Sequence, residues 1–204
     1  MPPKPKYTKE EIIQAAFEMA RESGIESVVA RELGKRLGIS STPIFTYFRN
    51  MNELYVEVRK LAMQEFELYT SHILDYTPPF KQFGVLMIQF AYDEPHLFRV
   101  LYMQEHQESQ NYDDMFQELG PAASYCVEIL QEKYGLHEEQ AYLVFKQVWI
   151  YTFSICVLIV NKICSFDKKE ISQMLSMQFQ STVMMVQTGK VIDIEVSKRK
   201  DKKE

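Results

Sequence analysis

The sequence predicts an all-α protein with about nine helices, and three observations carry that prediction. Apolar residues recur every three to four positions along most of the 204 residues. No segment shows the sustained alternation of apolar and polar residues that strands would require. Glycine and proline stand between the periodic segments, for example at Gly24, Gly38, Pro78 and Pro79. A hydrophobic content of 46% is enough for a sizeable core.

The first helix is predicted over residues 9–23. Thr8 and Glu11 have the spacing of a capping box, in which each side chain accepts a hydrogen bond from the backbone N–H of the other residue. Gly24 follows the last periodic residue, where helices commonly end. These three residues bound one amphipathic helix.

A second helix is predicted over residues 28–37, with Ser27 as its N-cap and Gly38 at its end. Three apolar residues at helical spacing form its expected inward face: Val29, Leu33 and Leu37. A third, short helix is expected within three residues of Gly38, so the two helices must be joined by a tight turn.

The third helix, at residues 40–48, carries most of the functional information. Ser40 is its expected N-cap, and Pro43 is tolerated in the first turn because N–H groups there have no intrahelical partner. Ile44 and Phe48 would face the core. The opposite face carries hydroxyl groups and aromatic rings: Ser41, Thr42, Phe45, Thr46 and Tyr47. This arrangement is typical of a helix-turn-helix, whose second helix enters the DNA major groove, although a plain helical hairpin has the same spacing.

Three short segments of this region form a specific pattern: residues 30–40 read ARELGKRLGIS, residues 44–48 read IFTYF and residues 52–54 read NEL. The pattern consists of a glycine, a capping serine, an aromatic pair and a final Glu-Leu at fixed spacing. With these motifs the chain closely resembles the TetR/AcrR family of bacterial transcription regulators over about residues 8–58. The resemblance implies a DNA-binding domain over residues 1–50, with an N-terminal arm. It also implies a ligand-responsive repressor that binds a palindromic operator as a homodimer.

The third helix departs from the family pattern in its charge. No basic residue lies between Arg36 and Arg49, and Phe45 stands where the family usually has a phosphate-contacting tyrosine. The candidate DNA contacts therefore extend beyond this helix: Lys6, Arg31, Lys35, Ser40, Ser41, Thr42, Pro43, Phe45, Thr46, Tyr47, Asn50 and Asn52. Bases are expected to be read by four of these residues: Ser41, Thr42, Phe45 and Thr46. Tyr47 and Lys35 are expected to contact phosphates. A helical interaction protein that has lost DNA binding is the alternative.

The rest of the chain is predicted to form a helical domain over residues 51–190, followed by a charged tail at 191–204, and the resemblance implies that this domain binds an effector and dimerises. Asn50 and Glu53 have capping-box spacing, which begins a connecting helix over residues 51–75. Further helices are expected at 80–91, 95–104, 113–134, 137–163 and 168–188. By resemblance to the family, the connecting helix transmits the effector signal.

Aromatic residues concentrate in this second domain, with 18 of the 26 between positions 61 and 160. Ordinary core and an apolar effector cavity both explain such a region, and the resemblance favours a cavity. Nine residues are its expected lining: Phe66, Tyr69, Phe90, Phe98, Tyr102, Met103, Phe116, Tyr125 and Trp149. Residues 61–195 hold 18 acidic against 8 basic residues, which favours a lipophilic cation, leaves a neutral apolar effector open and disfavours a polyanion. A regulator without a small-molecule effector is the alternative.

The helix at 137–163 is apolar on nearly every side between Val148 and Val160. That stretch is shorter than the roughly 20 residues that span a bilayer, so no membrane contact is expected. A helix that is apolar all round must be covered all round. By resemblance, this helix and the one at 168–188 would pair with the same two helices of a second copy. Six residues are expected in that homodimer interface: Ile155, Leu158, Ile159, Leu175, Phe179 and Val183. A monomeric core is the alternative.

The sequence contains no recognisable catalytic or metal-binding pattern. Its four histidines are scattered, and HExxH, Cys-x-x-Cys, GxGxxG and P-loop spacings do not occur. We therefore expect no enzyme activity, no metal and no cofactor. Three cysteines and the absence of an apparent signal sequence indicate a reduced, cytoplasmic bacterial protein that associates with the nucleoid when it is bound to its operator.

Overall fold

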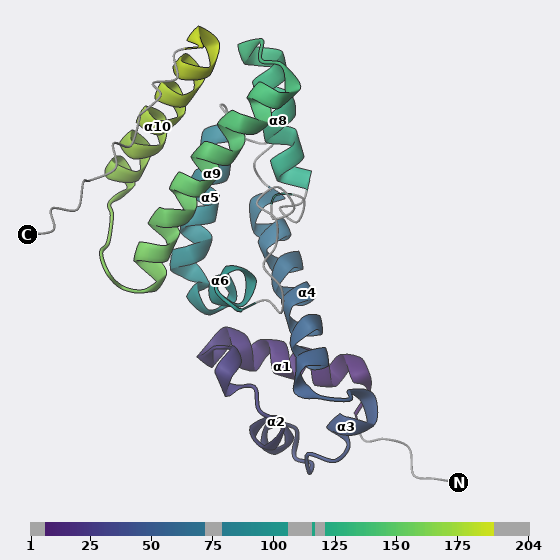
Figure 1. Ribbon diagram of the computed structural model, residues 1–204. Helices are drawn as coiled ribbons and strands as arrows, with labels where there is room; N and C mark the ends of the chain where they lie inside the picture. Colours follow the sequence, from purple (N-terminus) through teal and green to yellow (C-terminus); the bar gives the residue numbers. More distant parts are fainter. Residues whose placement is uncertain (1–6, 72–78, 106–115, 117–120, 190–204) are drawn as a thin grey trace, which may run out of the picture.

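The computed structural model describes residues 7–71, 79–105, 116 and 121–189 (Figure 1). These residues form nine α-helices and one short 3-10 helix and include no strand, which confirms the predicted all-α class. The elements in chain order are α1 (Lys9–Ser23), η1 (Ile25–Ser27), α2 (Ala30–Leu37), α3 (Ile44–Tyr47), α4 (Met51–Thr70), α5 (Pro79–Asp93), α6 (Pro95–Tyr102), α8 (Pro121–Tyr134), α9 (Glu138–Val160) and α10 (Lys168–Thr188).

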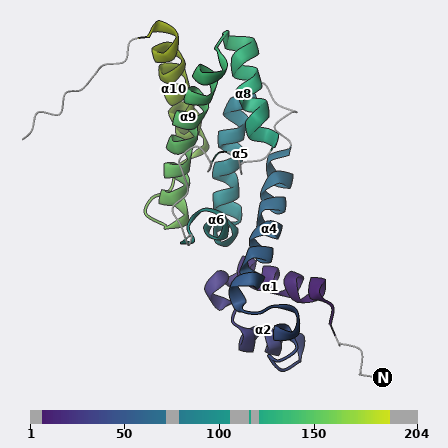
Figure 2. The same ribbon diagram turned by 45° about the vertical axis from the view of Figure 1, so that its right-hand side comes forward.

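The helices form two groups along one long direction (Figure 1). The short helices α2 and α3 lie with α1 at one end, and α4 runs from them into the second group. The helices α5, α8, α9 and α10 lie beside one another at the other end, while α6 sits close to α1 (Figure 2). Because α4 packs against α1, α5 and α6, this one helix contacts both groups.

The first helix begins as the sequence predicts. The Thr8 hydroxyl accepts a hydrogen bond from the Glu11 backbone N–H at 3.2 Å, and the Glu11 carboxylate accepts one from the Thr8 N–H at 2.7 Å. The helix ends at Gly24, whose φ is 87°. The apolar residues that hold the N-terminal helices together are fully buried: Ile12, Ala16, Ala20, Leu33, Ile44 and Leu54.

The second helix begins two residues later than predicted, and Ser27 does not cap it. Ser27 belongs to η1, where its hydroxyl donates to the Gly24 carbonyl at 2.7 Å. The N-cap of α2 is Val29, which makes no side-chain capping bond and is 43% exposed, so its predicted inward orientation is wrong. Val28 is the buried residue instead, because the 3-10 turn before α2 changes which side chain faces the core.

The third helix is also shorter than predicted. Its first residue is Ile44 and its N-cap is Pro43, so Ser40 is not the capping residue. The backbone N–H groups of Ile44 and Phe45 donate to the carbonyls of Ser41 and Thr42, each at 3.1 Å, which makes this entry a turn that continues into the helix. The α-helix starts late because these N–H groups bond to the third preceding residue, as in a 3-10 turn, and not to the fourth.

The connecting helix α4 begins at its predicted cap. The Asn50 side-chain oxygen accepts from the Glu53 backbone N–H at 3.0 Å. The helix ends at Thr70, and the predicted continuation to residue 75 lies mostly outside the described residues. The first part of the helix expected at 113–134 lies outside them too, apart from Phe116, and α8 begins at Pro121.

Helix α9 is the central helix of the second group. It packs against α5, α6, α8 and α10, so neighbours surround much of its apolar surface. By length and composition it is the one helix in the described part of the chain that could cross a membrane, but half of its most apolar window is buried inside the protein. A core helix passes the same test, and the packing accounts for its composition.

Candidate functional site

Two glycines shape the turn between α2 and α3. Gly38 ends α2 with φ at 65°, a left-handed conformation that glycine adopts without a steric penalty. Gly34 lies inside α2, where an added Cβ would stand 2.9 Å from the Ile39 carbonyl oxygen and 3.3 Å from the Ser40 carbonyl carbon. The chain after α2 therefore returns closely over Gly34, which places α3 across the second helix.

Helix α3 has one buried face and one exposed face, as predicted. Ile44 and Phe48 are buried in the N-terminal core, while Thr42, Phe45 and Thr46 are exposed. The Phe45 side chain is 47% exposed, although contact of its apolar ring with water is unfavourable. Ser41 and Pro43 are half-buried beside this face, and Ser40 is exposed. The result is a ridge of hydroxyls and one ring, with Thr42 in the turn before α3 and Phe45 and Thr46 on the helix.

The Tyr47 hydroxyl donates a hydrogen bond to the backbone carbonyl of Tyr7 at 3.0 Å. This bond uses the only proton of the hydroxyl, so in this conformation Tyr47 holds Tyr7, two residues before α1, against α3 and does not donate to a phosphate. Lys6, another predicted contact, lies outside the described residues. Asn50 and Asn52 are exposed at the start of α4, where helix N–H groups favour an anion.

The basic side chains of α2 are paired with acidic neighbours. Lys35 Nζ lies 2.7 Å from a Glu32 carboxylate oxygen, and Arg36 makes two bonds to Glu22, at 2.6 and 2.8 Å. These hydrogen bonds lower the pKa of Glu22 and of Glu32. Arg31 is exposed on the same helix. The surface around α3 therefore carries little uncompensated positive charge.

The sequence of this same region matches a known family. The sequence model of the family described as "Bacterial regulatory proteins, tetR family" matches residues 12–58, the span that holds most of α1, all of α2 and α3, and the start of α4. Residues 12–58 are therefore similar to the TetR family.

Curated relatives agree with the TetR match but over a limited length. An HTH-type transcriptional repressor of Mycobacterium tuberculosis and an uncharacterized HTH-type transcriptional regulator of Mycobacterium bovis are each 34% identical to this chain over 64 residues, or 31% of the chain. The matched segment covers 24% of the length of each relative.

A solved structure extends the comparison to the C-terminal helices. A protein described as the flavonoid-responsive regulator FrrA is similar with a TM-score of 0.50 and 15% identity, over 85% of this chain and 93% of that protein. At that identity the similarity shows a shared fold: an N-terminal helix-turn-helix domain followed by a helical domain.

Most of the predicted effector residues form a packed aromatic cluster. Phe66 of α4 meets Phe90 of α5 with ring centroids 5.2 Å apart, and Tyr69 meets Phe90 at 5.4 Å. Phe98 and Tyr102 of α6 lie 5.0 Å apart, and the Tyr102 ring continues the cluster to Trp149 and through it to Phe116. Two predicted residues stand apart: Met103 is exposed at the end of α6, and Tyr125 is half-buried on α8.

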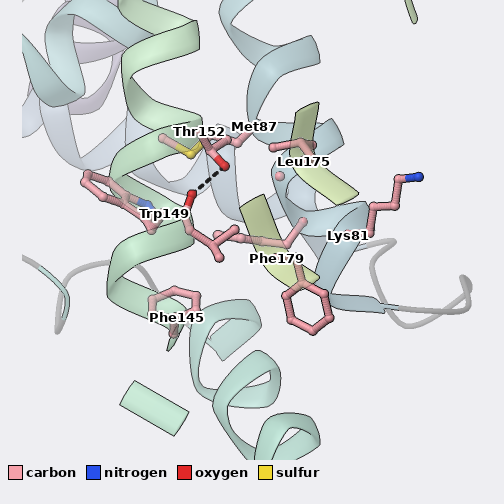
Figure 3. Close-up of a pocket in the computed structure, with 10 residues that line it drawn as sticks. Lys81, Met87, Phe145, Trp149, Thr152, Leu175 and Phe179 are labelled. Carbon is pink, nitrogen blue, oxygen red and sulfur yellow. Dashed lines mark hydrogen bonds between the residues drawn. The ribbon is translucent and has the colours of Figure 1, made fainter. Parts of the chain in front are cut away.

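An apolar cavity lies elsewhere, between α5, α9 and α10 (Figure 3). It is small, with a volume of about 20 Å³, which is room for about one water molecule. Ten residues line it: Lys81, Phe83, Gly84, Met87, Phe145, Val148, Trp149, Thr152, Leu175 and Phe179. Trp149 is the only one of the nine predicted effector residues among them. Sequence reasoning missed the others because three helices distant in the chain supply them.

The charge of this cavity differs from the sequence-based expectation. The lining contains one charged residue, Lys81, and no Asp or Glu. The acidic surplus of residues 61–195 therefore lies elsewhere on the molecule, and the inference of a cationic effector from that surplus is not supported by the lining. In the described part of the chain, no cluster of His, Cys, Asp or Glu could hold a metal ion.

Most of the residues predicted for the dimer interface are buried within a single chain. Ile155, Ile159, Leu175 and Val183 are buried, and Leu158 and Phe179 are half-buried. The buried four cannot form a surface for a second copy without repacking, so their assignment to the interface is corrected. Other apolar residues of α9 and α10 are exposed: Tyr142, Leu143, Ile150, Met177, Met184 and Met185.

Proposed function

We propose that this protein is a DNA-binding transcriptional repressor of the TetR type, which binds a palindromic operator as a homodimer and is released by a small lipophilic effector. The observation that carries the proposal is the exposed ridge of Thr42, Phe45 and Thr46, held on the buried Ile44 and Phe48 in a domain that matches the TetR family. Such a protein works in the cytoplasm, on the nucleoid, and needs no cofactor.

The chemistry of the ridge indicates how it would read bases. Threonine methyl groups and the Phe45 ring suit contact with thymine methyl groups, and the hydroxyls suit direct or water-bridged hydrogen bonds. Arginine-to-guanine pairing is not available from α3, which has no basic residue. Affinity would then depend less on phosphate charge than is common, because Glu22 and Glu32 already neutralise Arg36 and Lys35.

Homodimer formation is supported by apolar surface that the single chain leaves uncovered. Ile150 on α9 is 40% exposed, and Met177 and Met184 on α10 are 72% and 62% exposed. A second copy that covers this surface would present two recognition helices, and a symmetric operator has half-sites about 34–36 Å apart or a multiple of that distance.

The apolar cavity between α5, α9 and α10 would have to enlarge to hold an effector, because it has room for about one water molecule. The structural neighbour FrrA is described as flavonoid-responsive, which is consistent with a small-molecule effector in this fold. Release requires that the effector bind more tightly to a state that cannot grip the operator. A regulator without an effector is the alternative, and it predicts that no ligand changes operator affinity.

The decisive experiment selects genomic fragments from the source organism on the purified protein and measures affinity for the enriched site by fluorescence anisotropy. Thr42→Ala and Thr46→Ala should each change the preferred base at a few positions. Gln173→Ala, at an exposed position of α10, is the matched control and should leave the preference unchanged. Failure to enrich any sequence would favour a helical interaction protein that does not read DNA.

A further inference from the structure

The basic side chains around α3 differ in how far they are already paired. Arg36 donates two hydrogen bonds to the Glu22 carboxylate, and Lys35 donates two to Glu32, at 2.7 and 3.0 Å. Arg31 also lowers the pKa of the Glu32 carboxyl, after the larger effect of the Lys35 hydrogen bond. A phosphate that approached α2 would therefore meet cations that share their charge with carboxylates, and the carboxylates would repel it.

Lys9 is a cation of a different kind, because it has no carboxylate partner. It is the first residue of α1, and its Nζ lies 5.4 Å from the centroid of the buried Phe48 ring. Among the described residues it makes no ion pair. The dipole of α1 opposes a cation in the first turn, so helix stability does not account for a lysine here. The ring face positions the ammonium without neutralising its charge.

Arg49 follows Phe48 directly, in the connection between α3 and α4. Its side chain is 92% exposed, and its closest approach to a carboxylate of the described residues is 3.7 Å, from Nε to Glu53 Oε1. That distance is longer than a hydrogen bond. The other Glu53 oxygen accepts the backbone N–H of Arg49 at 2.8 Å, which keeps the carboxylate at the backbone. The two terminal nitrogens of the guanidinium form a fork that matches a phosphate.

Lys9 and Arg49 lie at the same end of α3. The Tyr47 hydroxyl donates to the Tyr7 carbonyl at 3.0 Å, and this bond and the contact of Lys9 with Phe48 place the start of α1 beside the end of α3 (Figure 1). A helix in the major groove, which is about 12 Å wide, lies between two phosphate backbones. Cations at one end of that helix can therefore reach the backbone on their side of the groove.

We propose that Lys9 and Arg49 are the main phosphate contacts of the DNA interface, and that Lys35 and the other cations of α2 contribute little. This inference rests on the proposed function and deepens it, because it assigns the electrostatic part of the affinity to one end of α3. Phosphate contacts carry no sequence information. Loss of either cation should therefore weaken binding to all duplexes alike, whereas the sequence-based expectation places the contact at Lys35.

The test measures affinity of the full chain for the enriched genomic site and for a random-sequence duplex, by fluorescence anisotropy between about 50 and 200 mM salt. The logarithm of the affinity falls linearly with the logarithm of the salt concentration, with a slope of about 0.9 for each phosphate contacted. In the proposed homodimer, Lys9→Met and Arg49→Met should each lower that slope by about 1.8 and weaken both duplexes at least about tenfold near 100 mM salt. Lys35→Met should leave the slope nearly unchanged.

Matched variants separate a local contact from a change in net charge or fold. Lys9→Arg and Arg49→Lys keep the charge and should keep most of the slope. Lys60→Met removes one charge from the exposed pair with Glu57 on α4, and it should leave the slope unchanged. Lys9→Met retains an apolar stem for packing on Phe48. Thermal unfolding of each variant reports whether the fold is retained.

A second measurement locates the contacts on the DNA. Single methylphosphonates, each of which removes the charge of one phosphate, are scanned along the enriched site. At the phosphate that Arg49 contacts, the substitution should weaken the native protein and have no further effect on Arg49→Met. An unchanged slope in Lys9→Met or in Arg49→Met, or a larger loss in Lys35→Met, would overturn the inference and leave DNA binding in place. If the native protein binds neither duplex, the inference and the proposed function are both wrong.

Discussion

Among single residues, Tyr47 links α3, which carries the ridge proposed to read DNA, to the chain before α1 through its bond to the Tyr7 carbonyl. Tyr47→Phe should lower the free energy of unfolding by about 1 kcal/mol and weaken binding to all operator sequences alike, by about fivefold. Thermal unfolding and anisotropy titrations measure the two effects. Tyr55→Phe is the matched control, because the Tyr55 hydroxyl makes the same kind of bond, to the Val28 carbonyl at 2.9 Å, away from α3. Equal losses of DNA affinity in both variants would contradict a role specific to Tyr47.

The three cysteines also differ residue by residue. Cys164 is exposed, whereas Cys126 and Cys156 are buried. Burial raises the pKa of Cys126 to about 12, and it raises the pKa of Cys156 still further, so both stay protonated thiols at pH 8. A thiol-reactive chromophore at pH 8 should label one site quickly in the native protein and three after denaturation. Cys164→Ser should remove the fast reaction, and fast labelling of more than one site would show that the helices open readily.

At the scale of elements, the junction of α2 and α3 depends on the lack of a side chain at Gly34. Alanine has the higher helix propensity, worth about 1 kcal/mol, but its Cβ would press on backbone atoms of Ile39 and Ser40 that cannot move independently. Gly34→Ala should therefore destabilise the domain by about 1 to 3 kcal/mol and weaken operator binding by displacing α3. Chemical denaturation and anisotropy would measure this. A more stable variant with native DNA affinity would show that the turn adapts at no cost.

A second element-scale feature joins the two helix groups at the corner between α5 and α6. Arg21 of α1 binds Glu94 through two guanidinium nitrogens and lies 3.5 Å from Glu65 of α4. The neighbouring Asp93 accepts a hydrogen bond from Tyr69 of α4. Motion of α4 or of the α5–α6 corner would thus act on α1 directly.

Removing this link should affect signalling more than stability. Arg21→Met should cost no more than about 1 kcal/mol, because the pair is partly exposed. It should reduce the ratio between operator affinities measured without and with effector. Lys60→Met, which breaks the exposed Lys60–Glu57 pair of α4, is the matched control and should leave the ratio unchanged. An unaltered ratio in Arg21→Met would place the coupling elsewhere.

At the scale of the whole molecule, the exposed apolar surface of α9 and α10 predicts a homodimer. Light scattering should give a mass near twice 24.1 kDa. Replacing Ile150 and Met177 together by glutamate should halve that mass, because two charges would be buried without partners at the interface. Leu68→Glu is the control, since Leu68 is 65% exposed on α4, outside that surface, and its substitution should leave the mass unchanged.

The sequence by itself determined the helical class, the start of α1 and α4, and the division of α3 into a buried and an exposed face. These features depend on neighbours in the chain: the spacing of apolar residues, and a cap and its partner three residues apart. The sequence did not predict the start of α2 correctly, because the Ser27 hydroxyl donates to the Gly24 carbonyl and does not cap the helix. The domain boundaries and the DNA-contact residues remain predictions.

Only the tertiary structure decided which apolar faces meet. Periodicity shows that α9 and α10 have apolar faces, yet it does not show that Ile155 and Leu175 are buried within one chain while Ile150 and Met177 remain exposed. Periodicity also does not show that Lys81 of α5 lines a cavity together with residues of α9 and α10. The physical reason is that hydrophobic burial is not directional: it requires that an apolar face be covered, but the partner is set by the packing of helices far apart in the sequence.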